Sequence, residues 1–360
     1  MARMPKSTGS LELGSTVVNG VSVHRRAEHM PDLPAGPFVR TDNGSILSVA
    51  GSPAQAHMSE DEGATWQSRS LFAGDSAMSS APTGALLKAT TGTIVAAFAN
   101  LGERHWTWQD ELRDAPGARL PTYAMRSLDG GKTWQDLQKL HDAWTGATRD
   151  ILQTRAGAII FSSMKMHHDP GRHAVLTYRS EDDGASWQGS NVIDLGGNGH
   201  HGGVTESTLV ELSDGRLLQY LRTNWGEFWQ AISIDGGHYW HPYGPAGIPA
   251  SSAPGMLKRL ASGRLVLLWN RLYPEGADEY SLRGGDGIWS ATPVSNFREE
   301  LSISFSEDEC ESWSTPVVVA RNPGSECSYP YVFEAGPGIL WITAHRWNVK
   351  LRLREEDFVR

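Results

Sequence analysis

Cysteine is scarce in this chain of 360 residues, which contains only Cys310 and Cys327. Two cysteines are too few for a disulfide scaffold and no metal-binding pattern surrounds them, so a bridge between them is possible but not required. The sequence also has no apolar run long enough to cross a bilayer. Residues 1–10 lack the apolar core of a signal peptide, so we expect a cytoplasmic protein; a secreted protein without its export signal would look the same.

An excess of positive charge and long helical patterns are also absent. The formal net charge of −9 argues against nucleic acid or an anionic membrane as a partner. No long apolar stretch has the 3.6-residue period of a helix, so helices should be few. We expect a disordered tail over residues 1–12. Because no linker or low-complexity segment follows it, residues 13–360 should form a single domain.

What the sequence has instead is five copies of a short pattern with the shared form Ser-x-Asp-x-Gly-x-(Ser/Thr)-Trp, from which Tyr239 of the fourth copy and Cys310 of the fifth depart. The copies lie at residues 59–66, 127–134, 180–187, 233–240 and 306–313. In each copy the Asp can accept hydrogen bonds from backbone N–H groups of its own turn. The Gly can adopt positive φ, and the Trp can fold back as an apolar plug. Five copies with the same internal spacing indicate repeated supersecondary units.

A second repeat alternates with the first and consists of two apolar runs joined by a Gly-containing turn. It occurs six times, at residues 38–47, 86–95, 151–160, 209–218, 256–266 and 332–340. Such turns between short β-rich runs are typical of antiparallel hairpins. A hairpin, a third strand, the Asp turn and a fourth strand make one propeller blade. The sequence therefore predicts an all-β, six-bladed β-propeller, with residues 15–18 and 21–23 supplying the N-terminal strand that closes the ring.

The Asp turn resembles the Asp box, or BNR repeat, of the sialidase (neuraminidase) superfamily, over about residues 30–350. Asp boxes lie on the blade rim, so the resemblance implies the fold more strongly than the activity. It also implies a pocket on the propeller axis. In sialidases three Arg side chains bind the substrate carboxylate and a Tyr attacks the anomeric carbon. A Glu takes the Tyr proton, and an Asp on a mobile loop acts as the acid and base.

Several of these residues have counterparts in this chain. The segment from Thr205 to Arg222 resembles the one that carries the Glu and the second Arg, which correspond to Glu206 and Arg222. Arg298 precedes the fifth Asp turn, where the third Arg falls. Tyr329 opens blade six, where the nucleophilic Tyr falls, and Tyr331 is its near competitor.

Two parts of the sialidase pattern are missing. Residues 33–38 contain no Arg where the first Arg of the clamp should lie, and residues 50–55 contain no carboxylate where the catalytic Asp should lie. Arg149 opens an inner strand and could replace the missing Arg. Asp150 or His201 could replace the missing acid, since a His can donate a proton near neutral pH.

Other polar and aromatic residues should crowd the same end of the axis and suit an acidic or polyhydroxylated ligand. As further substrate-binding residues we expect Trp106, His200, Trp225 and Arg271. The pairs 167–168 and 200–201 are adjacent histidines. Neighbours on a strand point to opposite faces, so each pair offers at most one ligand to a metal. We therefore expect neither a metal nor a cofactor.

The residues favour a sialidase-like exo-glycosidase acting on a terminal acidic sugar. Tyr329 would be the nucleophile and Glu206 its base, with Arg222 and Arg298 holding the carboxylate. A neutral nucleophile avoids repulsion by an anionic sugar. One alternative is a uronate-specific polysaccharide lyase using His or Tyr as base beside Arg. The other is a propeller that binds a glycan or a protein without chemistry. A pure binder has no need of a Glu–Tyr pair within hydrogen-bonding distance.

Overall fold

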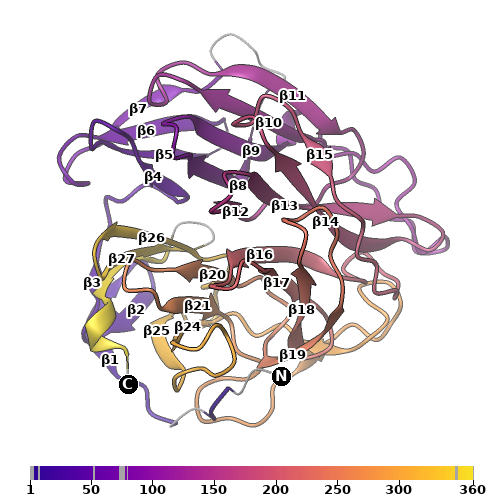
Figure 1. The fold of residues 1–360 in the computed structure, drawn as a ribbon. Coiled ribbons are helices and arrows are strands. Elements are labelled where there is room, and N and C mark those ends of the chain that lie inside the picture. Colours follow the sequence, from indigo (N-terminus) through magenta and orange to yellow (C-terminus); the bar gives the residue numbers. More distant parts are fainter. Residues whose placement is uncertain are drawn as a thin grey trace.

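Six antiparallel sheets form a ring in which the first strand of each sheet lies nearest to the centre (Figure 1). The computed structural model describes residues 4–6, 9–51, 53–72, 78, 80–344 and 348–359. Within this part of the chain there is no α-helix, although short 3₁₀ turns cover Leu101–Glu103 and Glu355–Asp357. No helix of the described residues is long and apolar enough to span a membrane. The fold is a six-bladed β-propeller, which confirms the prediction from the repeats.

Each blade contains four strands that follow one another from the centre outwards. The first three blades consist of β4 (Phe38–Arg40), β5 (Ile46–Ala50), β6 (Gln55–Ser59) and β7 (Gln67–Ser70); β8 (Ser80–Lys88), β9 (Ile94–Asn100), β10 (Thr122–Ser127) and β11 (Gln135–His141); and β12 (Ile151–Gln153), β13 (Ile159–His167), β14 (Arg172–Ser180) and β15 (Gln188–Gly189). The last three consist of β16 (Thr205–Glu211), β17 (Leu217–Arg222), β18 (Glu227–Ser233) and β19 (Tyr243–Pro249); β20 (Met256–Arg259), β21 (Leu265–Trp269), β24 (Glu300–Ser306) and β25 (Val317–Arg321); and β26 (Tyr331–Gly336), β27 (Ile339–Thr343), β28 (Lys350–Arg354) and β3 (Glu28–His29). All six predicted inner hairpins are present.

The Asp turns join the third and fourth strands of blades one to five, as predicted. In the first turn, Ser59 Oγ donates to Asp61 Oδ1 and accepts from Gly63 N, both at 2.8 Å. The Asp61 carboxylate accepts from Thr65 N at 2.8 Å and from Thr65 Oγ1 at 2.6 Å. The bonds from Thr65 are the main reason that the pKa of Asp61 falls to about 2. The same arrangement recurs at Asp129, Asp182 and Asp308.

The fifth turn shows how strictly this geometry is imposed. Its glycine position is occupied by Cys310, which adopts φ of +69°. The glycines at this position in the other four turns have φ between +81° and +92°. A side chain in the left-handed region costs roughly 1–2 kcal/mol, so the bonds of the turn outweigh the strain at Cys310. Cys310 and Cys327 are both buried and free, so the possible bridge between them does not form.

The ring is closed by an N-terminal strand, but the segment predicted to do so lies elsewhere. Residues 15–18 and 21–23 fall in the hairpin β1 (Leu13–Val18) and β2 (Val21–His24). This hairpin pairs through β2 with β25 and extends blade five at its outer edge. The short strand β3 pairs with β28 and completes blade six instead. The hairpin covers backbone groups that an exposed edge strand would leave unpaired.

Neighbouring blades are joined by apolar seams and by arginines that reach backbone carbonyls of the next Asp turn. Leu47 of blade one packs with Ile94 and Met125 of blade two in one buried cluster. Arg126 donates to the Asp182 carbonyl at 3.2 Å, and Arg179 donates to the Gly236 carbonyl at 2.9 Å. These seams fix the inner strands relative to one another, and the candidate site is built on the ends of those strands.

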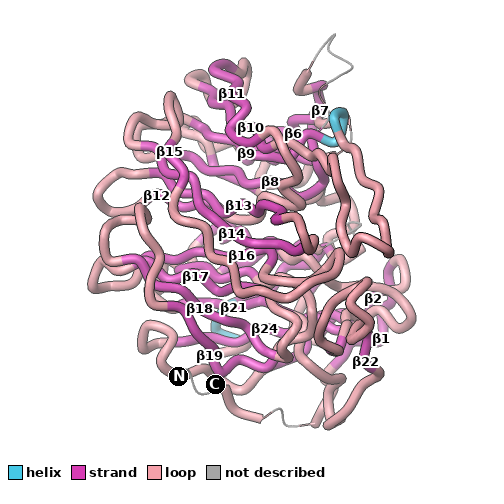
Figure 2. The backbone as a smooth tube through the Cα atoms, turned by 90° about the vertical axis from the view of Figure 1, so that its right-hand side faces the viewer, coloured by secondary structure: helices cyan, strands magenta, loops and turns pink. Residues whose placement is uncertain are grey.

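Blade five contains an insertion that the repeats do not predict. The two short strands β22 (Leu282–Arg283) and β23 (Val294–Ser295) pair with each other between β21 and β24. Figure 2 shows β22 on the side of the ring where the longer loops gather, opposite to the short turns. Backbone bonds from His200 N to the Ile288 carbonyl and from His201 N to the Trp289 carbonyl tie residues 196–203 to this insertion.

Candidate active site

A β-bulge in blade four positions the first two residues of the site. Thr205 of β16 is opposite Arg222 of β17, but the next aligned pair is Ser207 with Leu221. Glu206 is thus an extra residue between the two pairs, and such bulges redirect side chains at strand ends. Its Oε2 lies 2.6 Å from Arg222 Nη1, and both side chains are buried. Burial alone would raise the pKa of Glu206, but the charges of Arg222 and Arg149 outweigh it and keep the carboxyl ionised.

Tyr329 completes a triangle with this ion pair from the opposite end of the chain. Its hydroxyl donates to Glu206 Oε1 at 3.2 Å, and Arg222 Nη1 lies 3.3 Å from the same hydroxyl oxygen. Tyr329, two residues before β26, has a φ of +62°, a left-handed conformation that is strained for a residue with a side chain. The arrangement places a phenol, a carboxylate that can accept its proton and a guanidinium within hydrogen-bonding reach.

Tyr331, the competitor for the nucleophile, is bound elsewhere. Its hydroxyl donates to the Gly84 carbonyl at 2.8 Å and accepts from Gly84 N at 3.0 Å. The ring is buried, and burial raises the pKa of its hydroxyl. Tyr331 therefore ties blade six to blade two, whereas Tyr329 meets Glu206.

Arg298 and Arg149 approach the ring of Tyr329. The guanidinium carbons lie 5.7 Å (Arg298) and 5.3 Å (Arg149) from the ring centroid. Arg298 Nη2 donates to the Ser252 carbonyl at 2.7 Å, and Nη1 lies 3.7 Å from the carboxylate of Glu326. With Arg222, three guanidinium groups lie around one tyrosine. That Arg149 replaces the first Arg of a carboxylate clamp stays a prediction.

A pocket of about 260 Å³ opens beside this group. Its lining includes Glu206, Arg222 and Tyr329 and, from the predicted set, Trp106, His200 and His201. Sequence reasoning assigned no role to the remaining lining residues, Arg104, Trp144, Gly146, Met164, His173 and Thr205. Of these, His173 could have been predicted from its position as the second residue of β14. This strand begins on the side of the ring where the long loops lie, so its first side chains lie near the pocket.

Histidines and tryptophans form the wall of the pocket. The Nδ1 atoms of His200 and His201 are in hydrogen-bond contact, and the His201 ring stacks on Trp289 with 4.8 Å between centroids. Trp106 packs against Trp144 at 4.2 Å. Burial, followed by the charge of Arg222, lowers the pKa of His201 to about 2. Burial also lowers the pKa of His173 to about 4. Both imidazoles are neutral at pH 7.

Five of the predicted residues do not line the pocket. Arg298 and Arg149 approach Tyr329 from outside the lining, and the other three lie elsewhere. Asp150 is partly buried and accepts from Thr208 Oγ1 at 2.6 Å and from Leu209 N at 2.7 Å, so it joins blade three to blade four. Arg271 forms ion pairs with Glu275 and Glu300 and lines a separate cavity. Trp225 is 37 % exposed and packs on Trp229.

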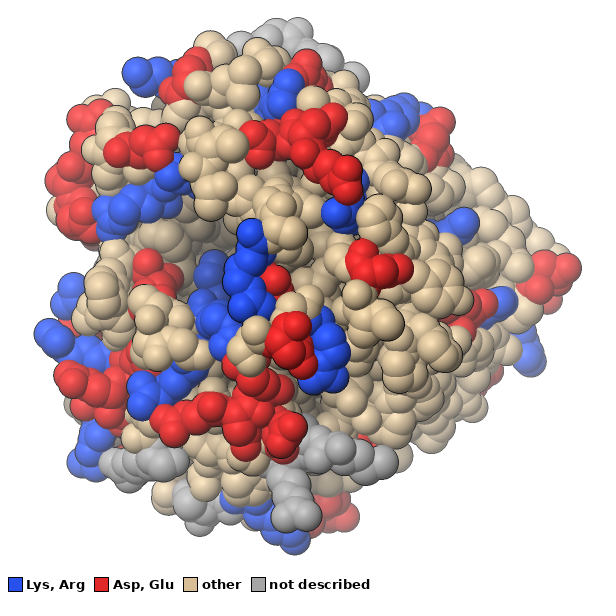
Figure 3. Space-filling model, in the orientation of Figure 1, with Lys and Arg blue, Asp and Glu red and all other residues tan. Residues whose placement is uncertain are grey.

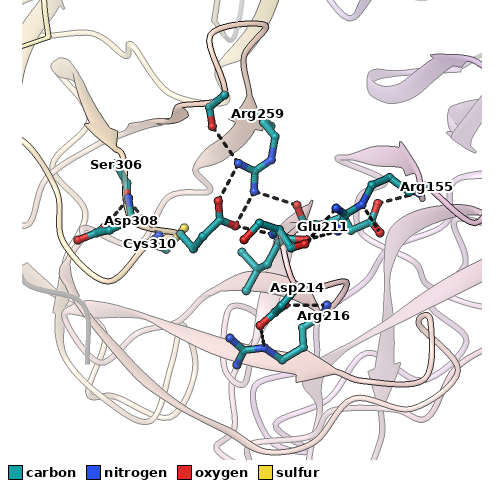
Figure 4. Close-up of polar contacts among 12 residues, drawn as sticks. Arg155, Glu211, Asp214, Arg216, Arg259, Ser306, Asp308 and Cys310 are labelled. Carbon is teal, nitrogen blue, oxygen red and sulfur yellow. Dashed lines mark hydrogen bonds and ion pairs between the residues drawn. The ribbon is translucent and has the colours of Figure 1, made fainter.

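A larger cavity, of about 430 Å³, lies at the other end of the inner strands and does not contain the Glu206–Tyr329 pair. Asp150, Arg155 and Arg259 are part of its lining. On the face shown in Figure 3, Lys and Arg side chains gather at a hollow near the middle. In this region Arg155 forms an ion pair with Glu211 of the next blade, as Figure 4 shows. Arg259, also labelled in Figure 4, forms an ion pair with Glu309. The Arg155–Glu211 pair joins blade three to blade four, whereas Arg259 and Glu309 both belong to blade five. Glu309 also accepts from Ser213 N of blade four at 2.7 Å, so these paired charges help to hold neighbouring blades together.

The adjacent histidine pairs do not form a metal site. His168 Nδ1 lies 2.9 Å from Asp114 Oδ1, whereas His200 and His201 contact each other in the pocket. In the described part of the chain, no group of three or more His, Cys, Asp or Glu side chains is arranged to hold a metal ion.

The fold and the Tyr–Glu–Arg triangle together define a propeller of the sialidase type. The sequence model of the BNR repeat-like domain matches residues 54–342, and the chain belongs to this family. A sialidase from Micromonospora viridifaciens is 27 % identical over 237 residues, which cover 59 % of this chain but only 33 % of that protein. The chain thus spans about a third of the length of this curated relative.

Solved structures share the fold at low sequence identity. A microbial sialidase, Hadza Hz136, aligns with a TM-score of 0.63 and 16 % identity, covering 90 % of this chain and 66 % of its own. A protein of unknown function from Dyadobacter fermentans aligns with a TM-score of 0.62 and 16 % identity, covering 93 % and 98 %. The intramolecular trans-sialidase of Ruminococcus gnavus, in complex with oseltamivir carboxylate, aligns with a TM-score of 0.58 and 13 % identity, covering 90 % and 94 %.

Proposed function

We propose that the protein is a sialidase-like exo-glycosidase that removes a terminal acidic sugar, sialic acid or a related sugar acid, from a glycan. The observation that carries the proposal is the contact of Tyr329 Oη with Glu206 Oε1 at 3.2 Å at the edge of a pocket. A phenol that donates to a buried, ionised carboxylate can transfer its proton as it attacks. Arg222 and Arg298 beside it suit a carboxylate on the substrate.

The chemistry would proceed in two displacements. Tyr329 Oη forms a bond to the anomeric carbon, Glu206 takes the phenol proton, and the bond from the anomeric carbon to the leaving oxygen breaks. Water then attacks the tyrosyl-bound carbon, the bond from that carbon to Tyr329 Oη breaks, and Glu206 returns the proton to the phenol. The group that protonated the leaving oxygen in the first step takes the proton that the water loses. Two successive inversions at one carbon would retain its configuration.

His201 is the candidate for the group that protonates the leaving oxygen, because it lines the pocket and Asp150 does not. It is neutral in the free protein, so it can serve only after gaining a proton. Burial is the largest cause of its low pKa, and a bound carboxylate would offset the further lowering by Arg222 and Arg298. His201 would therefore become a donor in the complex with substrate.

The test compares two substrates. A fluorogenic aryl sialoside has a leaving group that needs little proton donation, and sialyllactose has one that needs it. Glu206→Gln should abolish turnover of both, whereas His201→Gln should lose turnover mainly on sialyllactose. Intact turnover in folded Glu206→Gln would refute the Tyr–Glu mechanism.

A uronate lyase is the second candidate, because the pocket contains three neutral histidines, His173, His200 and His201, next to arginine. A lyase would release an unsaturated uronate, detected by its ultraviolet absorbance, when the protein is given a panel of acidic polysaccharides. Ligand-induced stabilisation without any product would instead indicate a glycan-binding propeller.

A further inference from the structure

Arg149 is a buried cation that reaches across the centre of the ring. It precedes β12 in blade three, and its side chain is 1 % exposed. Its contacts are on blade six, at the opposite side of the ring. Nη2 donates to the Pro330 carbonyl at 2.8 Å, and the guanidinium carbon lies 5.3 Å from the Tyr329 ring centroid and 4.6 Å from that of Tyr331. Three consecutive residues, 329–331, are thus held by one arginine.

The burial of the Arg149 guanidinium is energetically unfavourable. Its Nε and Nη1 atoms are buried and have no hydrogen-bond partner among the described residues. It forms no ion pair with any carboxylate in that part of the chain. An unpaired buried charge is strongly unfavourable, and the two ring faces and one carbonyl compensate it in part. Nε and Nη1 of Arg149 are shielded, its Nη2 is bonded to the Pro330 carbonyl, and Arg149 does not line the pocket, whereas Arg222 does. Arg298 is also outside that lining, but its side chain is 12 % exposed and is therefore more accessible to a ligand than that of Arg149.

Arg149 contacts Tyr329, whose backbone conformation is strained. Tyr329 is in the left-handed region and directly precedes Pro330, and a following proline disfavours helical conformations further. This backbone conformation directs the Tyr329 hydroxyl to Glu206. A bond to the Pro330 carbonyl and a contact with the ring stabilise the conformation on both sides of the residue.

We propose that Arg149 is the positioning residue of Tyr329. Its guanidinium packs on the Tyr329 ring and holds the Tyr329 hydroxyl in hydrogen-bonding contact with Glu206, and Arg149 is not a third ligand for the substrate carboxylate. The part of this inference that concerns turnover rests on the proposed function. The part that concerns the conformation of Tyr329 is independent of it.

The first measurement needs no substrate. The nine tyrosines are labelled with 3-fluorotyrosine, and the ¹⁹F resonance of Tyr329 is assigned by its loss in Tyr329→Phe. In Arg149→Met we expect this resonance to shift and broaden, and in Arg149→Lys to change less. Arg155→Met, which removes an arginine from the same hairpin away from Tyr329, should leave it unchanged. An unchanged Tyr329 resonance in folded Arg149→Met would overturn the proposal.

The second measurement separates positioning from binding. Arg149→Met should lower kcat on an aryl sialoside by about 10- to 100-fold, because a misplaced nucleophile loses its near-attack geometry. Its affinity for 2,3-didehydro-N-acetylneuraminic acid should stay within about threefold of wild type, whereas Arg298→Met should bind at least about tenfold more weakly. Equal loss of affinity in both variants would make Arg149 a ligand of the carboxylate and refute the proposal.

Failure of the proposed function is distinguishable from failure of this inference. If the wild-type protein neither binds the analogue nor turns over the sialoside, the proposed glycosidase function is wrong. The ¹⁹F comparison then still decides whether Arg149 positions Tyr329. If Arg149→Met does not fold, Arg149→Lys, which retains the charge but not the planar donor, provides the same comparison. An unshifted resonance and unchanged kcat in Arg149→Lys and in Arg149→Gln would then overturn the proposal.

Discussion

The neutral histidines of the pocket wall should make the protein sensitive to mild acid. Burial lowers the pKa of His173 to about 4 and that of His201 to about 2, from 6.5 in the unfolded chain. Between pH 6.5 and these values the unfolded chain binds more protons than the folded one, so the free energy of unfolding falls as the pH falls. From pH 7 to pH 5 each histidine should lower it by about 2 kcal/mol, and both together by about 4 kcal/mol.

Carboxylates contribute little in this window. The pKa values of Asp61, Asp129 and Glu103 are lowered to about 2, so their stabilisation is present above about pH 4.5 and is lost only below it. The decline between pH 7 and pH 5 should therefore come from histidine. Other buried histidines also lower the free energy of unfolding of the wild type between pH 7 and pH 5. The test is therefore the difference between wild type and variants.

The assay is urea unfolding at pH 7, 6 and 5 for wild type, His173→Asn, His201→Asn and the double variant. The double variant should lose about 4 kcal/mol less than wild type between pH 7 and pH 5. His238→Asn, which replaces an exposed histidine, should decline as wild type does. Identical declines in wild type and the double variant would refute the reasoning.

Three further outcomes are expected. Asp182→Ala removes the bonds of one Asp turn and should lower the free energy of unfolding by roughly 1–3 kcal/mol with unchanged activity per folded molecule; lost activity without lost stability would contradict the structural role. Tyr331→Phe should cost about 1 kcal/mol in urea and keep turnover, whereas Tyr329→Phe should keep stability and lose turnover; the reverse pattern would exchange their roles. Glu206→Gln should lose turnover yet bind an anionic analogue at least as tightly in calorimetry, because Arg222 loses its counter-charge; weaker binding would argue against this charge balance.

The fold could be predicted because its signals are local. The Asp turn depends on bonds within eight residues, and each hairpin on a Gly turn between two apolar runs. Ring closure could not be predicted in the same way, because β1 and β2 pair with blade five and the two-residue β3 has no pattern of its own. The insertion β22–β23 was missed because it falls outside the repeats.

The site could be predicted only where a strand pattern fixes the direction of a side chain. Glu206 and Arg222 are at the ends of one hairpin and meet. Arg149 and Asp150 were both expected at the site, but consecutive residues in extended backbone point in opposite directions. Arg149 reaches Tyr329, and Asp150 turns to blade four. Trp106, His200 and His201 were expected at the site and line the pocket. Their contacts with Trp144 and Trp289 join loops of different blades, which no repeat encodes.

The charge balance at Tyr329 leads to a last prediction, that an anionic ligand takes up a proton as it binds. Arg222, Arg298 and Arg149 act on the ionised Glu206, and Arg222 and Arg298 also lower the pKa of His201. Burial is the largest cause of the low pKa of His201, and the charges of Arg222 and Arg298 lower it further. A carboxylate bound beside these arginines would offset their part of the shift, so we expect the pKa of His201 to rise in the complex. At pH 5 the complex should then bind more protons than its free components, whereas at pH 8 it should not.

Calorimetry with 2,3-didehydro-N-acetylneuraminic acid in two buffers of different ionisation enthalpy measures this uptake directly. The heats should differ between buffers at pH 5 and agree at pH 8, and the affinity should increase from pH 7 to pH 5 by the linkage between proton and ligand. His201→Asn should abolish the difference at pH 5 and retain binding. Equal heats in both buffers at pH 5, with binding intact, would show that the arginines do not set the protonation of His201. That result would also remove His201 as the proton donor.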